Sequence, residues 1–564
     1  MRRFPAVVTA VLMLLTPAPA SAAPPRGHNP VSASFADTFA DPMVVRGDDG
    51  WFYAYGTTDP LREGERTPHR IPMARSADLR HWAYVGDAFA AGQRPAYAAA
   101  NTSYWAPDVR RIGNRWVMYV TVTETTTAPG ASAIGAATAP TPTGPWTFAD
   151  EPVVAPRPSG DGGWWWTFDP AQVTTPDGRR FLYYGSYYGG VWTSELTADG
   201  LHRTGTPTRV AIDNKFEGSF VVRRAGWYYL FASSANCCAG PTTGYSVSVG
   251  RARDPRGPFV DKLGRPLNTS RAGGTPVIAP NGNRWVGTGH NAVISDGHRD
   301  WFVYHAIDRG DPYLDEPSGI NERPMLIDRL DWIGGWPTVR AGAWASDGRD
   351  SGTAREPQPG RPLPRWSDEF DSKQKSWTFV RPDPAVTVTG GQLRWPVQGA
   401  DLTGDSDDAG VLLRAAPPGN WIAETRLTLP LGEDSVRNYQ QAGLIAYVGD
   451  DLFARLSAVA IGNTRQVEFG HEIPYAGTTS YGGTIAGTPG LTTTWLRLAH
   501  RVDPRNGEHE YRAGVSRDGR TWTWGGVWTL PAGTHPRIGL VAHGGATPPV
   551  TASFDYLRFS GLAG

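Results

Sequence analysis

The sequence of 564 residues contains only two cysteines, Cys237 and Cys238, and they are adjacent. A framework of disulfides that joins distant parts of the chain is therefore excluded. In an oxidising compartment the pair forms a vicinal disulfide or remains as two thiols. We expect a structural role in a loop rather than catalysis, because a nucleophilic thiol also needs an activating base.

Neither sign of charge is in excess, since 54 Lys and Arg residues balance 54 Asp and Glu residues. This balance argues against nucleic acid or an anionic membrane as a partner. Long apolar runs are also lacking, because the stretch from Ala6 to Leu15 is too short to span a bilayer. It follows Arg2-Arg3 and precedes Ala20-Ser21-Ala22, an order typical of a signal peptide. We therefore predict that residues 1–22 are a signal peptide and that the protein is secreted.

Long helical patterns are scarce, whereas glycine, proline and aromatic residues are abundant. The chain has 68 glycines, 49 prolines, 23 tryptophans, 21 tyrosines and 19 phenylalanines. This mixture favours an all-β protein with many short strands and tight turns. The length exceeds what one hydrophobic core normally supports, so we expect more than one domain.

Five segments share an aromatic, strand-like pattern that begins with Trp or Phe and includes Tyr. They are residues 51–55, 116–120, 181–184, 227–231 and 301–305. Aromatic and β-branched residues suit the half-buried surface of a sheet. A four-stranded blade takes about 40–50 residues, and more with loop insertions. The recurrence therefore predicts a five-bladed β-propeller over residues 33–342.

One polar residue lies eight to twelve positions before each aromatic segment, in a small-residue or proline setting. These residues are Asp41, Asp108, Asp169, Glu217 and His290. A single Asp-Pro pair is usually turn chemistry, because Asp caps its own backbone. Five such positions in register are different, since the innermost strands of all blades line one central channel. Gathering carboxylates there is costly unless they serve a function.

At these residues the chain resembles glycoside hydrolase family 43, in its group of five-bladed arabinanases, arabinofuranosidases and xylosidases. Each motif is weak alone, but their order and spacing are specific. The matching stretches are 39–42 (FADP), 104–109 (YWAPDV), 168–170 (FDP), 184–187 (YGSY), 216–219 (FEGS), 287–291 (GTGHN) and 335–337 (GWP).

The resemblance implies a role for each carboxyl group. Asp41 matches the general base, Glu217 the general acid, and Asp169 the carboxylate that orients the acid and adjusts its pKa. Inverting hydrolysis needs a protonated acid at the leaving oxygen and an ionised base that activates water, about 6.5–9.5 Å apart. A third carboxylate beside the acid raises the acid's pKa through repulsion of like charges.

Further site residues follow from the same comparison. His290 resembles a channel histidine that touches a calcium ion or its water shell, or else it is a plain hydrogen-bonding histidine, since calcium prefers oxygen ligands. Trp105 and Trp166 are expected to stack on sugar faces, although at least one tryptophan of the run 164–166 is expected to pack in the core. Asp108 is predicted to bind substrate. Arg323 is predicted to read a sugar hydroxyl, with a surface position as the alternative.

A polar, proline-rich stretch at residues 343–364 is typical of a linker. Alternating runs and a turn at Asp518-Gly519 then predict a β-sandwich over residues 365–564. It resembles a concanavalin-like or lectin-like domain. It either packs against the propeller, closing the mouth of the site, or binds carbohydrate itself. Residues 439–441 are candidates for sugar contact, with a strand-edge role as the alternative.

These features predict a secreted, inverting glycoside hydrolase that acts on oligo- or polysaccharide of plant type. The linkage we expect is α-L-arabinofuranosyl, cleaved from within the chain or from its end. The alternative within the class is a β-xylosidase or another furanosidase. The alternative from another class is a carbohydrate-binding propeller without catalysis, which would have no need of Asp41, Asp169 and Glu217 together.

Overall fold

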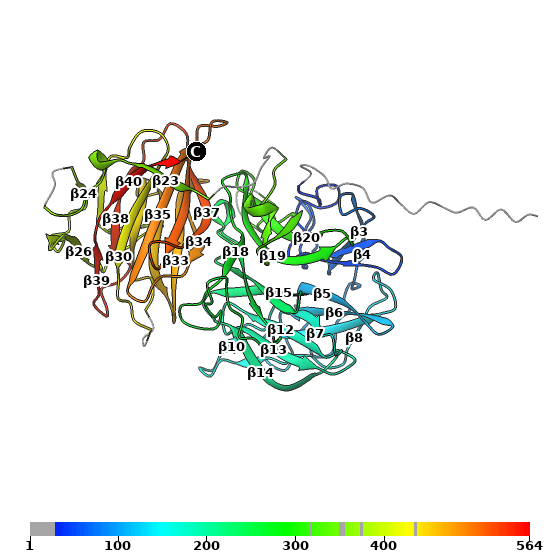
Figure 1. The fold of residues 1–564 in the computed structure, drawn as a ribbon. Coiled ribbons are helices and arrows are strands. Elements are labelled where there is room, and N and C mark those ends of the chain that lie inside the picture. Colours follow the sequence, from blue (N-terminus) through cyan, green and yellow to red (C-terminus); the bar gives the residue numbers. More distant parts are fainter. Residues whose placement is uncertain (1–28, 316–318, 349–355, 373–375, 434–436, 564) are drawn as a thin grey trace, which may run out of the picture.

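The computed structural model describes residues 29–315, 319–348, 356–372, 376–433 and 437–563. The predicted signal peptide lies outside these ranges. Within them the protein is all-β, as predicted, and its helices are three single 3-10 turns, η1 (Gly240–Thr242), η2 (Arg340–Gly342) and η3 (Pro364–Trp366). Figure 1 shows two bodies side by side, with the earlier part of the chain in one and the later part in the other.

The first body contains five four-stranded antiparallel sheets, each a simple meander. The prediction of a five-bladed propeller is confirmed. Blade 1 has β1 (Met43–Arg46), β2 (Phe52–Tyr55), β3 (Pro72–Ser76) and β4 (Trp82–Asp87). Blade 2 has β5 (Tyr104–Ile112), β6 (Arg115–Val122), β7 (Ala133–Ala139) and β8 (Thr147–Phe148). Blade 3 has β11 (Ala171–Thr174), β12 (Arg180–Ser186), β13 (Gly190–Leu196) and β14 (Arg203–Ala211). Blade 4 has β15 (Phe216–Arg224), β16 (Trp227–Ser234), β17 (Ser246–Ala252) and β18 (Thr275–Ile278). Blade 5 has β19 (Trp285–Ser295), β20 (Asp300–Asp308), β21 (Met325–Ile333) and β22 (Trp336–Val339).

The first strands of the blades form a closed ring. Each contacts the first strand of the next blade, from β1 through β5, β11, β15 and β19 and back to β1. The five aromatic segments found in the sequence fall on the second strands, whose side chains are buried between neighbouring blades. A short hairpin of β9 (Arg157–Pro158) and β10 (Trp164–Trp165) is inserted between blades 2 and 3. The closed ring places the start of every blade around one axis.

The second body consists of two large antiparallel sheets that share one apolar core. The first sheet has β23 (Gln358–Pro362), β25 (Thr387–Thr389), β26 (Gln392–Pro396), β30 (Trp421–Thr428), β35 (Thr493–Val502), β36 (His509–Ser516), β37 (Trp522–Leu530), β39 (Thr551–Phe554) and β40 (Arg558–Ala563). The second has β24 (Thr378–Val380), β29 (Val411–Arg414), β31 (Gln441–Gly449), β32 (Leu452–Ile461), β33 (Thr464–Tyr475), β34 (Thr478–Gly487) and β38 (Arg537–His543). A separate hairpin joins β27 (Leu402–Thr403) to β28 (Ser406–Asp407). The prediction of a β-sandwich is therefore confirmed.

One part of the predicted linker is a strand. Residues 358–362, which lie inside the range 343–364, form β23 and pair with β40. Their prolines indicated a linker, but a proline is compatible with a strand at a sheet edge, where its missing N–H is not needed for the ladder. The linker prediction is wrong for these five residues.

The two bodies meet through apolar and polar contacts, since Val286 and Ile307 of blade 5 belong to the apolar core cluster of the sandwich. The side-chain amide of Asn214 donates to Oδ1 of Asn463 at 2.9 Å, and Thr488 donates to the carbonyl of Ala272 at 2.7 Å. The hydroxyls of Thr242 in η1 and Ser480 in β34 also lie 2.9 Å apart. The sandwich thus contacts the loops of blade 4 directly.

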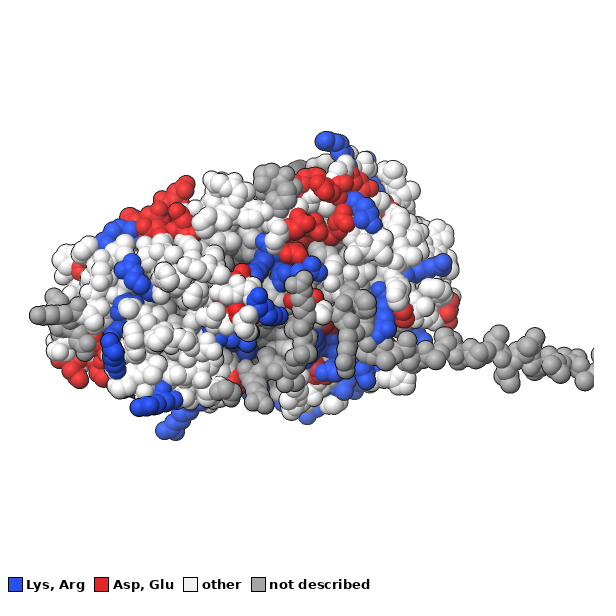
Figure 2. Space-filling view, turned by 90° about the horizontal axis from the view of Figure 1, so that it is seen from above, with Lys and Arg blue, Asp and Glu red and all other residues white. Residues whose placement is uncertain are grey.

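The view in Figure 2 shows how charge is distributed over one face. Acidic and basic side chains lie in small groups among uncharged ones, and neither sign covers the face as a whole. This distribution agrees with the equal totals of 54 basic and 54 acidic residues in the sequence. Across the described ranges, no helix has the length and apolar character needed to traverse a bilayer.

Candidate active site

A residue with left-handed backbone conformation interrupts the start of every blade. These residues are Asp41 (φ 51°), Ala106 (φ 47°), Asp169 (φ 56°), Gly218 (φ 55°) and His290 (φ 47°). In β5, β15 and β19 the strand pairing skips two residues at this point, which marks a β-bulge. Bulges bend a strand and redirect its side chains, and they are frequent next to active sites. Each blade therefore directs a segment with a left-handed residue toward the common axis, and in three blades this segment is a bulge.

The backbone N–H groups of these bulged residues are held by the preceding blade. Ala106 N–H donates to Thr57, Asp169 N–H to Thr121, His290 N–H to Ser233 and Asp41 N–H to His305, at 3.0–3.1 Å. The fourth blade differs. There Gly218 N–H donates to Oδ2 of Asp169 at 2.9 Å, and Ser186 of blade 3 donates to Oε2 of Glu217 at 3.0 Å. In blade 4, hydrogen bonds to the carboxylates of Asp169 and Glu217 thus replace the bond from a bulge N–H to a side chain without charge.

The bulge also corrects the prediction for Asp108. In blade 2 the residue equivalent to Asp41 is Ala106, and Asp108 lies two positions further along β5. Its side chain is only 2% exposed, forms a 2.7 Å ion pair with Arg110 and accepts the backbone N–H of Gln172. Asp108 links blades 2 and 3, and the prediction that it binds substrate is wrong.

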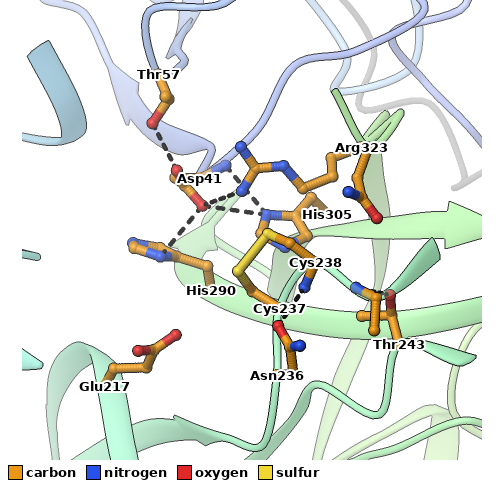
Figure 3. The surroundings of a disulfide bond; sticks show 12 residues. Asp41, Thr57, Glu217, Asn236, Cys237, Cys238, Thr243, His290, His305 and Arg323 are labelled. Carbon is orange, nitrogen blue, oxygen red and sulfur yellow. Dashed lines mark hydrogen bonds and ion pairs between the residues drawn. A yellow bond between two sulfur atoms is a disulfide. The ribbon is translucent and has the colours of Figure 1, made fainter. Parts of the chain in front are cut away.

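Asp41 is buried at the centre of a group of polar and charged residues (Figure 3). Thr57 donates to its Oδ2 at 2.6 Å. Its Oδ1 lies 3.3 Å from Nδ1 of His290, 3.3 Å from Nδ1 of His305 and 3.4 Å from the guanidinium of Arg323. Burial opposes ionisation, but the interactions with His290 and Arg323 outweigh it and hold the pKa of Asp41 well below its usual value. Asp41 is therefore ionised at neutral pH.

Arg323 is a component of this site and not a surface residue. Its side chain is 13% exposed, and its other terminal nitrogen lies 3.3 Å from Oδ2 of Asp59. Burial raises the pKa of Asp59 to about 6, against the opposing charge of Arg323 and with a further contribution from Asp41. The guanidinium is thus shared by two buried carboxyl groups, and Asp59 is a member of the site that the sequence did not reveal.

Glu217 and Asp169 form the second half of the site. Burial raises the pKa of Glu217, and the charge of Asp41 adds to this, while hydrogen bonds from Tyr245 and Ser186 oppose it. Burial and the charge of Glu217 also raise the pKa of Asp169 well above its usual value. Figure 3 shows Glu217 facing the space next to Asp41 and His290 from another blade. The structure therefore brings the three predicted carboxyl groups together. It lowers the pKa of Asp41 and raises the pKa values of Glu217 and Asp169.

Besides Asp59, two further residues of the site were not predicted from the sequence. His305 lies in β20 and contacts Asp41, and burial lowers its pKa to about 4. Tyr245 hydrogen-bonds to Glu217, and its ring stacks on His305 at 5.8 Å. Gly289 leaves room for Tyr245, since a Cβ there would lie 2.1 Å from the tyrosine ring. In sequence these residues are typical of ordinary strand positions, although a histidine at the end of an apolar segment was a usable signal.

Aromatic side chains extend from the site onto the surface between blades 2 and 3. Trp105 is 37% exposed and Trp166 is 40% exposed, and both pack against Phe168, next to Asp169. Tyr188 meets Trp166 edge to face at 4.6 Å. Trp164 is exposed and Trp165 half-buried, so the prediction that one tryptophan of this run packs in the core is wrong. Exposed aromatic faces beside carboxyl groups are suited to stacking on sugar rings.

The predicted calcium position can be compared with the donors around His290. A calcium ion takes about six to eight oxygen ligands. The ring of His290 faces Asp41, whose carboxylate is already contacted by Arg323 and His305. Over the described part of the chain, no group of three or more His, Cys, Asp and Glu side chains is arranged to hold a metal. These residues do not fit a calcium ion held by protein ligands, so we assign no step to a metal, and calcium binding stays a prediction.

Residues 28–337 match the family described as glycosyl hydrolases family 43. The matched region is more than half of the chain and contains every bulged residue of the site. The chain belongs to this family. As a family 43 member it is a glycoside hydrolase, and the prediction of an enzyme of this class is confirmed.

Relatives of this family 43 chain share the propeller region. The extracellular exo-α-(1→5)-L-arabinofuranosidase ArbA of Cellvibrio japonicus is 30% identical over 325 residues, which cover 53% of this chain and 85% of the relative. The extracellular endo-α-(1→5)-L-arabinanase 1 of Bacillus subtilis is 26% identical over 309 residues, covering 53% of this chain and 86% of the relative. Among solved structures, the α-L-arabinanase of Cellvibrio cellulosa complexed with arabinohexaose is 27% identical, covers 54% of this chain and 96% of its own, and has a TM-score of 0.45.

Proposed function

We propose that this glycoside hydrolase is secreted and cleaves α-L-arabinofuranosyl linkages in plant-type polysaccharide with inversion of configuration. The observation that carries the chemistry is the contrast between two carboxyl groups of one site. The pKa of Asp41 is lowered, whereas the pKa of Glu217 is raised. Two titratable groups whose surroundings separate their pKa values in this way are suited to act as base and acid.

In the proposed reaction, protonated Glu217 donates its proton to the glycosidic oxygen as the bond to the leaving group breaks. Ionised Asp41 accepts a proton from a water molecule that attacks the anomeric carbon from the opposite face. Asp169 accepts the N–H of Gly218 and so fixes the backbone next to the acid. Repulsion between Asp169 and Glu217 disfavours ionisation of both groups, so the pair retains a proton that Glu217 can donate.

The substrate assignment rests on the relatives and on the surface around the site. The two curated relatives described above are named for α-(1→5)-L-arabinosyl linkages, and both are named extracellular. Trp105 and Trp166 offer exposed rings for sugar stacking, and Arg323 lies next to Asp41, where we expect it to read a hydroxyl of a bound sugar. Secretion is supported further by the predicted signal peptide at residues 1–22.

Two isosteric variants test the roles of the carboxyl groups. Asp41→Asn and Glu217→Gln are each expected to lower kcat on arabino-oligosaccharides by about 10²–10⁴-fold, the usual contribution of one acid or base. An aryl arabinofuranoside with a good leaving group needs little protonation. It should therefore restore much of the activity of Glu217→Gln and little of that of Asp41→Asn. Equal behaviour of the two variants would contradict the assignment.

Substrate and stereochemistry are tested on the wild-type protein. Hydrolysis of arabinan, arabinoxylan, xylo-oligosaccharides and aryl glycosides is compared, and the first-formed anomer is followed by proton NMR. We expect arabinosyl substrates to be cleaved and the β-anomer to appear first from an α-linkage. Preferential cleavage of xylo-oligosaccharides would favour the β-xylosidase alternative, and an α-anomer formed first would refute inversion.

A further inference from the structure

The adjacent cysteines form a disulfide in the loop between β16 and β17 of blade 4. Figure 3 shows this disulfide beside Asp41, His290, His305 and Arg323, with Glu217 facing the same space. Cys238 is exposed and Cys237 is half-buried. The sulfur atoms therefore belong to the wall of the candidate active site and not to the core of the blade.

Stabilisation of the folded chain is a poor explanation for this bond. A disulfide stabilises mainly by restricting the unfolded chain, and the effect grows with the length of chain that it closes. Cys237 and Cys238 are separated by one position, so their bond closes no intervening segment. The pair neither joins two blades nor ties the propeller to the sandwich.

The loop that carries the disulfide is held firmly on both sides. Within it, the N–H of Cys238 donates to Oδ1 of Asn236 at 2.9 Å. After it, the N–H of Gly240 donates to Oδ1 of Asn321 at 2.8 Å, and a Cβ on Gly240 would lie 2.3 Å from a tyrosine hydroxyl. The sandwich supports the same loop through the contact between Thr242 and Ser480. A surface fixed in this way is preorganised for a ligand.

The chemistry of the disulfide complements the rest of the site. Its sulfur atoms and methylene groups are apolar and polarisable and carry no N–H or O–H donor. The neighbouring side chains of Asp41, His290 and Arg323 are all charged or polar. A pentose ring has a C–H face and hydroxyl edges, so it needs both kinds of surface, as carbohydrate and other small-molecule sites generally provide. Trp105 lies on blade 2 and Trp166 in the segment between blades 2 and 3, whereas the disulfide provides an apolar surface from blade 4.

We propose that the Cys237–Cys238 disulfide is a substrate-binding platform that packs against the C–H face of a pentosyl unit bound at the Asp41–Glu217 pair. This assignment rests on the proposed function, because it takes its ligand from it. The disulfide acts in binding and orientation of the sugar and takes no part in proton transfer.

The test compares the wild type with Cys237→Ser/Cys238→Ser, which keeps the size of the side chains and removes the bond. On arabino-oligosaccharides we expect KM to rise about tenfold, as expected for the loss of one or two C–H contacts. The melting temperature and the pH profile of kcat should stay close to those of the wild type. In a Glu217→Gln background, calorimetry should show a similar loss of affinity for the same oligosaccharides. Ile333→Ser, an apolar-to-polar change at an exposed residue of an outer blade strand, serves as the matched control and should leave KM unchanged.

A second measurement avoids dependence on the folding of the double variant. Reduction of the folded wild type with a phosphine should raise KM by the same factor, and reoxidation should restore it. If KM and affinity are unchanged in the serine variant, the disulfide is not a substrate-binding platform. If that variant does not fold, unchanged KM in the reduced wild type leads to the same conclusion. Neither result would contradict the proposed hydrolysis of arabinosyl substrates. A wild-type protein that cleaves and binds no pentose-containing glycan would instead overturn the proposed function, and the platform with it.

Discussion

Replacing Arg323 by methionine should move the acidic limb of the pH profile of kcat/KM to higher pH. The proposed base, Asp41, must be ionised to accept a proton from water, so activity falls as the pH drops through its pKa. The guanidinium of Arg323 stabilises the ionised carboxylate and lowers that pKa. Methionine keeps most of the volume but removes the charge, so protonation of Asp41 begins at a higher pH.

The size of the effect follows from the distance. A unit charge 3.4 Å from Oδ1 of Asp41 contributes about 5 kcal/mol at an effective dielectric constant of about 20 and about 1 kcal/mol in bulk water. The site is buried yet open to substrate and water, so the real value lies between these limits. Removal of one opposite charge at this range typically shifts a titration by about one to three pH units. The hydrogen bond from Thr57 and the contact with His290 remain in place and limit the shift.

The assay is kcat/KM of wild type and variants across the acidic and neutral range, with an arabino-oligosaccharide as substrate. Arg323→Lys is the matched control, because it keeps a positive charge while losing the planar fork of the guanidinium. If the guanidinium contacts sugar, both variants should lower the maximum of kcat/KM. Only Arg323→Met should displace the acidic limb of the pH profile. An acidic limb that stays at its wild-type position in Arg323→Met would refute the reasoning.

Three further outcomes follow from the same site. Ser186→Ala removes a hydrogen bond that favours ionised Glu217, so the pKa of Glu217 should rise. The basic limb of the pH profile of kcat/KM should therefore move to higher pH, and a limb displaced to lower pH would contradict this. Gly289→Ala places a methyl group 2.1 Å from a buried tyrosine ring and should lower the free energy of unfolding by about 1–3 kcal/mol in chemical denaturation. Gly449→Ala, where the new methyl group meets open space, is its control and should change stability little. If calcium binds at His290, dialysis against EDTA should lower turnover and added CaCl2 should restore it, whereas turnover unaffected by EDTA would contradict calcium binding.

The architecture of the propeller was accessible from sequence because it repeats. Each blade has an aromatic second strand, and that strand is buried between neighbours whatever the loops do. Once the second strands are located, the residues before them must line the axis, and this reasoning placed Asp41, Asp169 and Glu217 in one site. The sandwich followed from alternation of apolar and polar residues alone.

The predictions for individual residues of the site failed for a different reason. Asp108 was aligned with Asp41 by its neighbouring proline, but the bulge makes Ala106 the equivalent residue, and no residue pattern marks left-handed conformation at an alanine. His305 and Tyr245 reach the site from strands whose sequence indicates only a packed core. Which of several strand residues faces a carboxylate depends on the relative rotation of the blades, and that rotation is a property of the whole ring.

The contact between His305 and the backbone of Asp41 joins residues that are 264 positions apart. It also lies where the last blade meets the first. A polypeptide that has emerged only as far as the fourth blade already carries all three carboxyl groups, yet it lacks His290 and Arg323, the partners that keep Asp41 charged. Hydrolytic competence should consequently require the fifth blade, although that blade supplies none of the three carboxyl groups.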